Sequence, residues 1–173
     1  DGIRDKLVTG VQTCALPILF MVTQVDSIEA FKELVGTHLG YSDYKTVTQE
    51  EVNLFADATG DHQWIHVDPE RAKAGPFGGP IAHGYLTLSL IPVLMGQVVR
   101  TNGVRMGVNY GTNKVRFPAP VPVGAEIRLG AAVAEVEDVA GGIQVALDVT
   151  IEVKDAPKPS CVDRKSTRLN SSH

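Results

Sequence analysis

In the first part of the chain, apolar residues recur at helical spacing in short segments bounded by capping residues. Thr48 and Glu51 have the spacing of a capping box, and the helix that they begin stops at Gly60. Asp68-Pro69 supplies the N-cap side chain and first-turn proline of another short helix. We therefore expect helices over residues 27–34, over residues 49–59 and from residue 69 onward, with residues 61–67 as a connection between two of them.

Residues 85–99 are apolar on nearly every side, which predicts a long buried helix with a kink at Pro92. Beyond Gly103 the apolar period changes to two, which is typical of strands with one covered face. A buried helix followed by a strand meander predicts an antiparallel sheet wrapped around that helix, an α+β architecture called hot dog. Strands are expected over residues 41–47, 107–117, 125–136 and 142–153.

The two ends of the chain do not have the character of protein coding sequence. Residues 8–18 and residues 163–173 can be encoded by the two opposite strands of one DNA duplex, residue for residue, and that DNA resembles a common sequencing adapter. Residues 1–5 resemble its outer arm. Such segments are set aside before fold reasoning. The natural sequence is therefore expected to be one domain over residues 19–162, with Met21 as its start.

This trimming changes the charge and the cysteine content. The formal net charge of the whole chain is −4, to which residues 1–18 contribute zero and residues 163–173 contribute +2, so residues 19–162 carry −6. An acidic chain is a poor partner for nucleic acid. No apolar run approaches the roughly 18 residues of a membrane span. Cys161 is the single cysteine left, which fits a reducing cytoplasm.

The candidate chemistry is concentrated between the second helix and the long apolar one. Asp61 and His66 lie five residues apart on the expected connection, so both side chains can face one site, and His83-Gly84 begins the apolar helix. A carboxylate, an imidazole and a helix N-terminus are the groups needed to move a proton beside a polarised carbonyl. Each also has a structural use, because Asp after a helix end often accepts from loop amides and a histidine is often only hydrogen-bonded.

A metal site is the competing interpretation of this cluster. His62, His66, His83, Asp61 and Asp68 are close in sequence, and three such ligands can hold zinc with an open position. The chain has neither a cysteine pair nor a His-Glu-x-x-His helix in this region. We therefore expect no metal.

From residue 46 to residue 162 the chain closely resembles the MaoC-like dehydratases, or R-specific enoyl-CoA hydratases, in particular their actinobacterial single-hot-dog members. The matching stretches are FADATGD at 55–61, IHVD at 65–68, GPIAHG at 79–84 and VRFPAPV at 115–121. The resemblance implies reversible addition of water to a trans-2-enoyl thioester, a step of fatty acid metabolism. The product is the R-3-hydroxyacyl thioester.

The family pattern also implies a role for each residue. Asp61 and His66 would hold and activate one water molecule, and the sequence leaves open which of them is the base. The Gly84 amide would meet the developing enolate oxygen, and His83 and Tyr85 would contribute to substrate binding. The resemblance implies no cofactor, a substrate carried by coenzyme A or an acyl carrier protein, and a homodimer.

Two other functions remain open at this stage. A hot-dog thioesterase would hydrolyse the same thioester, but it usually has a carboxylate on or next to the central helix, and here no Asp or Glu follows Gly84 before Glu126. A non-catalytic binding module would bind the ligand and lose no rate on Asp61→Asn. Release of free thiol separates hydrolysis from hydration.

Residues 158–162 resemble the start of the family's last strand, which the adapter-like segment interrupts. Because residues 163–173 are polar, we expect them not to pair as that apolar strand would. The sequence therefore predicts an exposed sheet edge and reduced stability for this chain.

Overall fold

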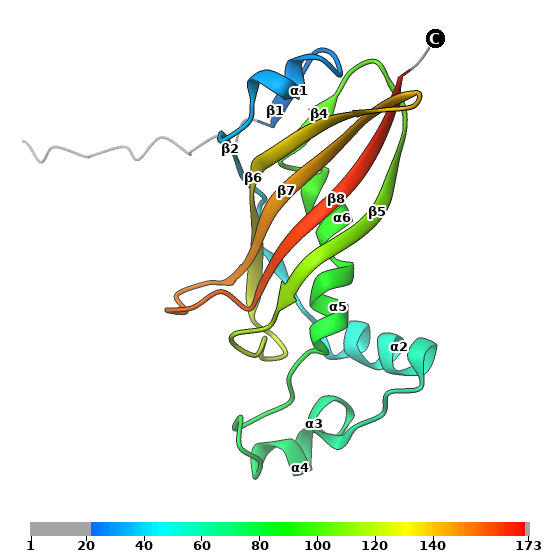
Figure 1. Ribbon diagram of the computed structural model, residues 1–173. Helices are drawn as coiled ribbons and strands as arrows, with labels where there is room; N and C mark the ends of the chain where they lie inside the picture. The colour runs from blue at the N-terminus through cyan, green and yellow to red at the C-terminus, as the bar shows by residue number, and fades with distance from the viewer. Residues whose placement is uncertain (1–21, 172–173) are drawn as a thin grey trace, which may run out of the picture.

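The computed structural model describes residues 22–171, so the adapter-like residues 1–18 and the last two residues lie outside the described part. Six strands form one antiparallel sheet in the order β2-β6-β7-β8-β5, with β3 paired to β6. Helices α5 and α6 run along one face of this sheet, and α2, α3 and α4 gather at one end of it (Figure 1). The predicted hot-dog architecture is confirmed.

The elements alternate between short helices and strands before residue 103, and only strands follow. β1 and β4 form a separate parallel pair near α1. The strands are β1 (Thr23–Val25), β2 (His38–Tyr41), β3 (Lys45–Thr46), β4 (Val99–Thr101), β5 (Val104–Arg116), β6 (Glu126–Val139), β7 (Gly142–Val153) and β8 (Cys161–Ser171). The helices are α1 (Ala30–Glu33), α2 (Gln49–Thr59), α3 (Trp64–Val67), α4 (Pro69–Lys73), α5 (Gly84–Ser89) and α6 (Ile91–Met95).

The core lies between the sheet and the α5–α6 segment. Alternate residues of β7 are buried on the helix side, as the period of two predicts, and they pack with Leu86, Ile91 and Leu94 of the helices. This burial is the main source of stability for a chain of this size. None of the described helices is long and apolar enough to cross a membrane.

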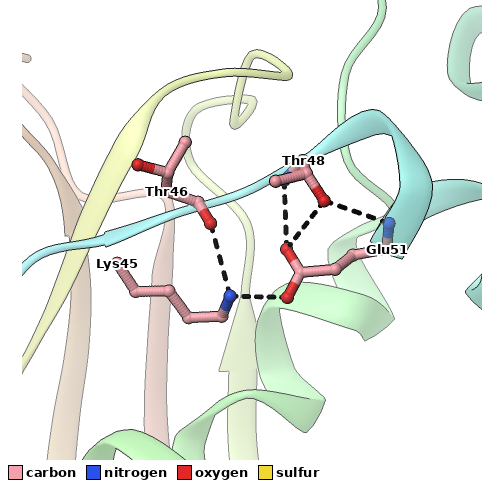
Figure 2. Close-up of polar contacts among 4 residues, drawn as sticks. All are labelled: Lys45, Thr46, Thr48 and Glu51. Carbon is pink, nitrogen blue, oxygen red and sulfur yellow. Dashed lines mark hydrogen bonds and ion pairs between the residues drawn. The ribbon is translucent and has the colours of Figure 1, made fainter.

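The predicted capping box of α2 is present. The Thr48 side chain accepts from the Glu51 amide, and the Glu51 carboxylate accepts from the Thr48 amide (Figure 2). Lys45 from β3 adds a charged contact to the same carboxylate. The helix ends at Gly60 in the left-handed conformation, with φ of 80°. These contacts fix both ends of α2, and therefore the point at which the chain leaves for Asp61.

Three predicted elements differ from the structure. The predicted strand over residues 41–47 is divided between the end of β2 at Tyr41 and β3 at Lys45–Thr46, because the Ser42 hydroxyl accepts from the Leu129 amide and interrupts the ladder. The connection at residues 61–67 contains one helical turn, α3. The apolar helix is divided into α5 and α6 at Leu90, two residues before Pro92, and ends at Met95. It is also not buried all round, since Tyr85 is 70% exposed and Val93 is 62% exposed.

The expectation that residues 163–173 leave an exposed sheet edge is wrong. β8 lies between β7 and β5 and pairs with both, so that Asp163 stands opposite Val149 on one side and Val115 on the other. Strand pairing uses backbone amides and carbonyls, which every residue except proline possesses. A polar segment can therefore occupy this position through its main chain alone.

The side chains of β8 fit the position less well than its backbone. Asp163 and Lys165 point toward the helices and are only 4% and 8% exposed. Within residues 22–171 neither carboxylate oxygen of Asp163 has a hydrogen-bond partner, and burial raises the pKa of this carboxyl. Burial lowers the pKa of Lys165, whose Nζ reaches Asn109 Oδ1. The inner face of β8 thus holds charge where β7 holds aliphatic side chains.

We expect Asp163→Val to stabilise this chain by about 1–3 kcal/mol, because it removes a buried carboxylate without a partner. The raised pKa means that the parent loses stability as the pH rises above the ordinary range of an aspartate, and the variant should not. Denaturant unfolding at pH 5 and pH 8 measures both effects.

The matched control is Arg164→Val, one residue along the same strand. Its side chain is 50% exposed on the other face and pairs with Asp148, so its loss should change stability by less than about 1 kcal/mol. A destabilised Asp163→Val protein would contradict the analysis of the inner face.

Candidate active site

Residues 61–83 connect the end of α2 to the start of α5, outside the sheet. Hydrogen bonds hold this connection together. The Ile81 amide donates to the Ile65 carbonyl, with N and O 3.0 Å apart. Gln49, in the first turn of α2, donates its side-chain amide to the His66 carbonyl at 2.7 Å. The turn of α3 that carries His66 is therefore held from both sides.

The His66 ring is buried and its orientation is fixed. Its Nδ1 lies 2.6 Å from the Ile81 carbonyl oxygen. A carbonyl oxygen only accepts, so Nδ1 carries the proton and Nε2 is left with a free lone pair. Burial lowers the pKa of His66, and the nearby His83 acts in the same direction, whereas the hydrogen bond to Ile81 and the charge of Asp61 act against them. His66 is consequently a neutral imidazole at neutral pH.

His83 joins Asp61 to His66. Its Nε2 lies 2.9 Å from the Asp61 main-chain oxygen, and its ring stacks on the His66 ring with centroids 3.8 Å apart. The Asp61 side chain is exposed, and one of its oxygens accepts weakly from the Gln63 amide at 3.4 Å. The three side chains that the sequence singled out are thus brought together, and Asp61 also makes the loop contact expected of its structural role.

A cavity of about 310 Å³ lies at the start of α5. His66, Gly84 and Thr87 line it together with Phe117 and the segment that follows Phe117. A methyl group at position 84 would lie 3.0 Å from the Phe117 ring, so only glycine leaves the helix N-terminus open beside that ring. The first amides of a helix have no intrahelical partner, and here Gly84, the first residue of α5, lines the same cavity as His66.

The two residues expected to bind substrate take other positions. Neither Tyr85 nor His83 is among the residues that line this cavity. Tyr85 is largely exposed and meets the Phe117 ring edge-on, with centroids 6.0 Å apart. Neither Gln49 nor the Ile81 carbonyl could be predicted from the sequence, because contacts across 15 or more residues leave no local pattern.

The geometry argues against a metal centre. Asp61, His66 and His83 each offer a ligand atom, and these atoms lie within 4.8 Å of one another. Tetrahedral zinc with bonds of about 2.0–2.1 Å holds its nitrogen and oxygen ligands roughly 3.3 Å apart. The stacked histidine rings are tilted by only 26°, so their in-plane lone pairs do not converge on one ion. The cluster would have to rearrange to bind zinc, and the expectation of no metal stays a prediction.

Comparison with known proteins covers the part of the chain that contains Asp61, His66 and Gly84. Residues 30–154 match the family model of the MaoC-like domain. The chain belongs to the MaoC-like family. A similar protein, 3-hydroxyacyl-thioester dehydratase Z from Mycobacterium tuberculosis, is 54% identical over 144 residues, which cover 83% of this chain and 95% of that protein.

Solved structures show the same fold. A monoamine oxidase regulatory protein from Archaeoglobus fulgius superimposes with a TM-score of 0.70 at 25% identity, covering 88% of this MaoC-like chain and 99% of the other. The (R)-hydratase of A. caviae superimposes with a TM-score of 0.62 at 25% identity, covering 73% of this chain and 91% of that one.

The environments of two neighbouring histidines predict opposite pKa shifts. His66 should titrate below the ordinary value of about 6.5 because it is buried, and His62 above it because its ring is hydrogen-bonded to Asp57. An NMR pH titration of the imidazole resonances measures both. Since the unfolded chain binds a proton at His66 more readily, this residue should cost stability as the pH falls below about 6.5. A His66 pKa above that of His62 would contradict the assignment of His66 as a neutral imidazole at neutral pH.

Proposed function

We propose that this MaoC-like domain catalyses the reversible addition of water to a trans-2-enoyl thioester and the reverse dehydration of the 3-hydroxyacyl thioester. The observation that carries the proposal is the lone pair of His66 Nε2, left by the hydrogen bond of Nδ1 to Ile81, on a ring that lies near the Asp61 carboxylate and lines one cavity with Gly84. The name of the mycobacterial relative and the (R)-hydratase neighbour support the same reaction.

In the hydration direction both acceptors are needed. A water molecule can donate one proton to His66 Nε2 and the other to the Asp61 carboxylate, which directs its oxygen lone pair at the β-carbon. As the C–O bond forms, one O–H bond breaks and the C=C electron pair moves toward the thioester oxygen. The Asp61–His66 pair takes the proton and returns it to the α-carbon. The neutral state of His66 at neutral pH supports its part as an acceptor.

The developing enolate needs a hydrogen-bond donor. Gly84 lies at the first position of α5 and on the cavity wall with His66, so its amide is the proposed oxyanion donor. A donor of this kind contributes about 10²–10³ in rate where it has been removed elsewhere. The absence of a Cβ lets the thioester carbonyl approach this amide closely.

The stereochemistry of the product and the carrier of the thioester are also proposed. We assign the R configuration to the hydroxy product and either coenzyme A or an acyl carrier protein as the thioester carrier. Both assignments rest on the family likeness, and chiral analysis of the product tests the first. The cytoplasm is the proposed compartment, because Cys161 is a buried free thiol. Cell fractionation tests that assignment.

Hydrolysis of the same thioester is less well supported. α5 and α6 carry no carboxylate that could attack the thioester or activate water next to it. The carboxylate of this site comes from the loop after α2 instead.

We expect Asp61→Asn and His66→Gln each to lower kcat by about 10²–10⁴, since each removes a proton acceptor from the water molecule. The assay follows the loss of enoyl absorbance from a short trans-2-enoyl-CoA, together with free thiol. Consumption without thiol release supports hydration, and thiol release would establish a thioesterase. Parent protein that binds the substrate but turns over none of it would establish a binding module.

His62→Gln is the matched control. This histidine is close in sequence but exposed and paired with Asp57, so the variant should keep nearly full activity. Gly84→Ala in the same assay should lower kcat/KM, because the new methyl group meets the Phe117 ring. Alanine keeps the amide at position 84, so a fully active Gly84→Ala enzyme would contradict the need for a close approach of the thioester to this helix start.

We also propose that the enzyme is a homodimer joined through β5. This strand has 13 residues, pairs with β8 on one side and has no strand on its other side within residues 22–171. A long exposed edge strand is prone to pair with another strand. Met106, Val108 and Tyr110 are exposed along it, and a second copy in a twofold arrangement would cover them.

We expect this chain to sediment as a dimer and Val108→Lys to shift it toward the monomer, because like charges then face each other across the twofold axis. Sedimentation velocity between about 1 and 100 µM measures the equilibrium. Leu54→Lys is the control, since Leu54 is exposed on α2 and away from β5. A parent protein that stays monomeric throughout this range would contradict the proposal.

A further inference from the structure

His83 does not line the cavity, but it contacts the residues that carry the two proposed proton acceptors. Its ring is 3% exposed and lies between His66, at 3.8 Å, and Phe55, at 4.9 Å. Its Nε2 contacts the main chain of Asp61. Its own carbonyl accepts both the amide and the hydroxyl of Thr87, one turn into α5. One residue therefore touches both proton acceptors and the helix that presents Gly84.

The protonation state of this ring follows from its partners. Nε2 faces the Asp61 carbonyl oxygen and must carry a proton, so a neutral ring has its lone pair on Nδ1. Nδ1 is buried and has no donor among the described residues, and it does not cap α5. A buried acceptor without a donor destabilises a fold. The stability of the helix start thus gives no reason for an imidazole at this position.

We propose that His83 is a positioning residue of the hydration site: its Nε2–H holds the Asp61 main chain beside the His66 imidazole, on which its ring stacks. The inference rests on the proposed function, because it assigns His83 a purpose in aligning the two acceptors with the Gly84 amide. It gives His83 no direct contact with the substrate.

The alignment has a kinetic consequence. Asp61 lies on an exposed loop, and its side chain makes only a long contact to Gln63. Within residues 22–171, the bond from His83 is the hydrogen bond that ties the Asp61 main chain to the side chains of the site. A misplacement of about 1 Å of a reacting group can lower the rate by about 10²-fold.

Two substitutions separate the hydrogen bond from the stack. His83→Phe keeps an aromatic ring against His66 but has no donor for Asp61. His83→Gln has an N–H the same number of bonds from the main chain as Nε2, but no ring. We expect His83→Phe to lower kcat by about 10–100-fold with KM changed less than about threefold, and His83→Gln to recover at least about a third of the parent kcat.

Phe55→Leu is the matched control for packing, because Phe55 touches the other face of the ring without any hydrogen bond. It should keep nearly full activity. Thermal unfolding of all three variants shows whether a lost rate reflects a lost fold, and a purely structural role for His83 would lower the melting temperature and kcat together.

NMR provides a readout that does not depend on turnover. Imidazole ¹⁵N shifts of the full chain should show the Nε2–H tautomer for His83 and the Nδ1–H tautomer for His66. The Asp61 carbonyl ¹³C shift should move in His83→Phe and stay close to the parent in His83→Gln. A parent without turnover would sink the proposed function and leave this test intact. Parent-like kcat in His83→Phe, equal loss in both variants, or the Nδ1–H tautomer at His83 would overturn the inference.

Discussion

The hydrogen bond from His66 Nδ1 to the Ile81 carbonyl is the contact on which the arrangement of the site depends. It joins the two ends of an excursion that leaves the sheet after α2 and returns at α5. The same bond selects the tautomer of His66 and leaves the Nε2 lone pair on a ring that lines one cavity with Gly84. A single main-chain acceptor thus sets both the shape of the loop and the chemical state of the imidazole within it.

The rest of the molecule holds the two ends of that excursion at fixed places. The capping box and Lys45 fix the start of α2, while the sheet and the aliphatic side chains of α5 and α6 fix its return. Gln49 links the two regions, because it belongs to the first turn of α2 and bonds the His66 carbonyl. The packed core in this way holds the polar groups of the site in place, although some of them lie at the surface.

Local rules predicted the caps of α2 and α4, the three long strands and the proximity of Asp61 and His66, because each depends on residues close in sequence or on a strong period. They did not predict the split at Ser42, since that bond reaches residue 129. They also did not predict that Tyr85 would turn away from the cavity, because the apolar pattern of residues 85–99 cannot distinguish a face covered by the same chain from one left exposed. The buried position of His83 likewise follows from contacts across 22 residues.

The pairing of β8 shows that backbone hydrogen bonds do little to select which sequence occupies a strand position in a sheet. Ladder hydrogen bonds are the same for every sequence, so a gap between two long strands accepts almost any extended segment. What identifies a segment as belonging there is its inward face, and at Asp163 and Lys165 that face is charged where its neighbours are aliphatic. Two side chains therefore set this strand apart from its neighbours where regular main-chain pairing does not, and buried charge of this kind marks a segment that is poorly matched to its place in a sheet.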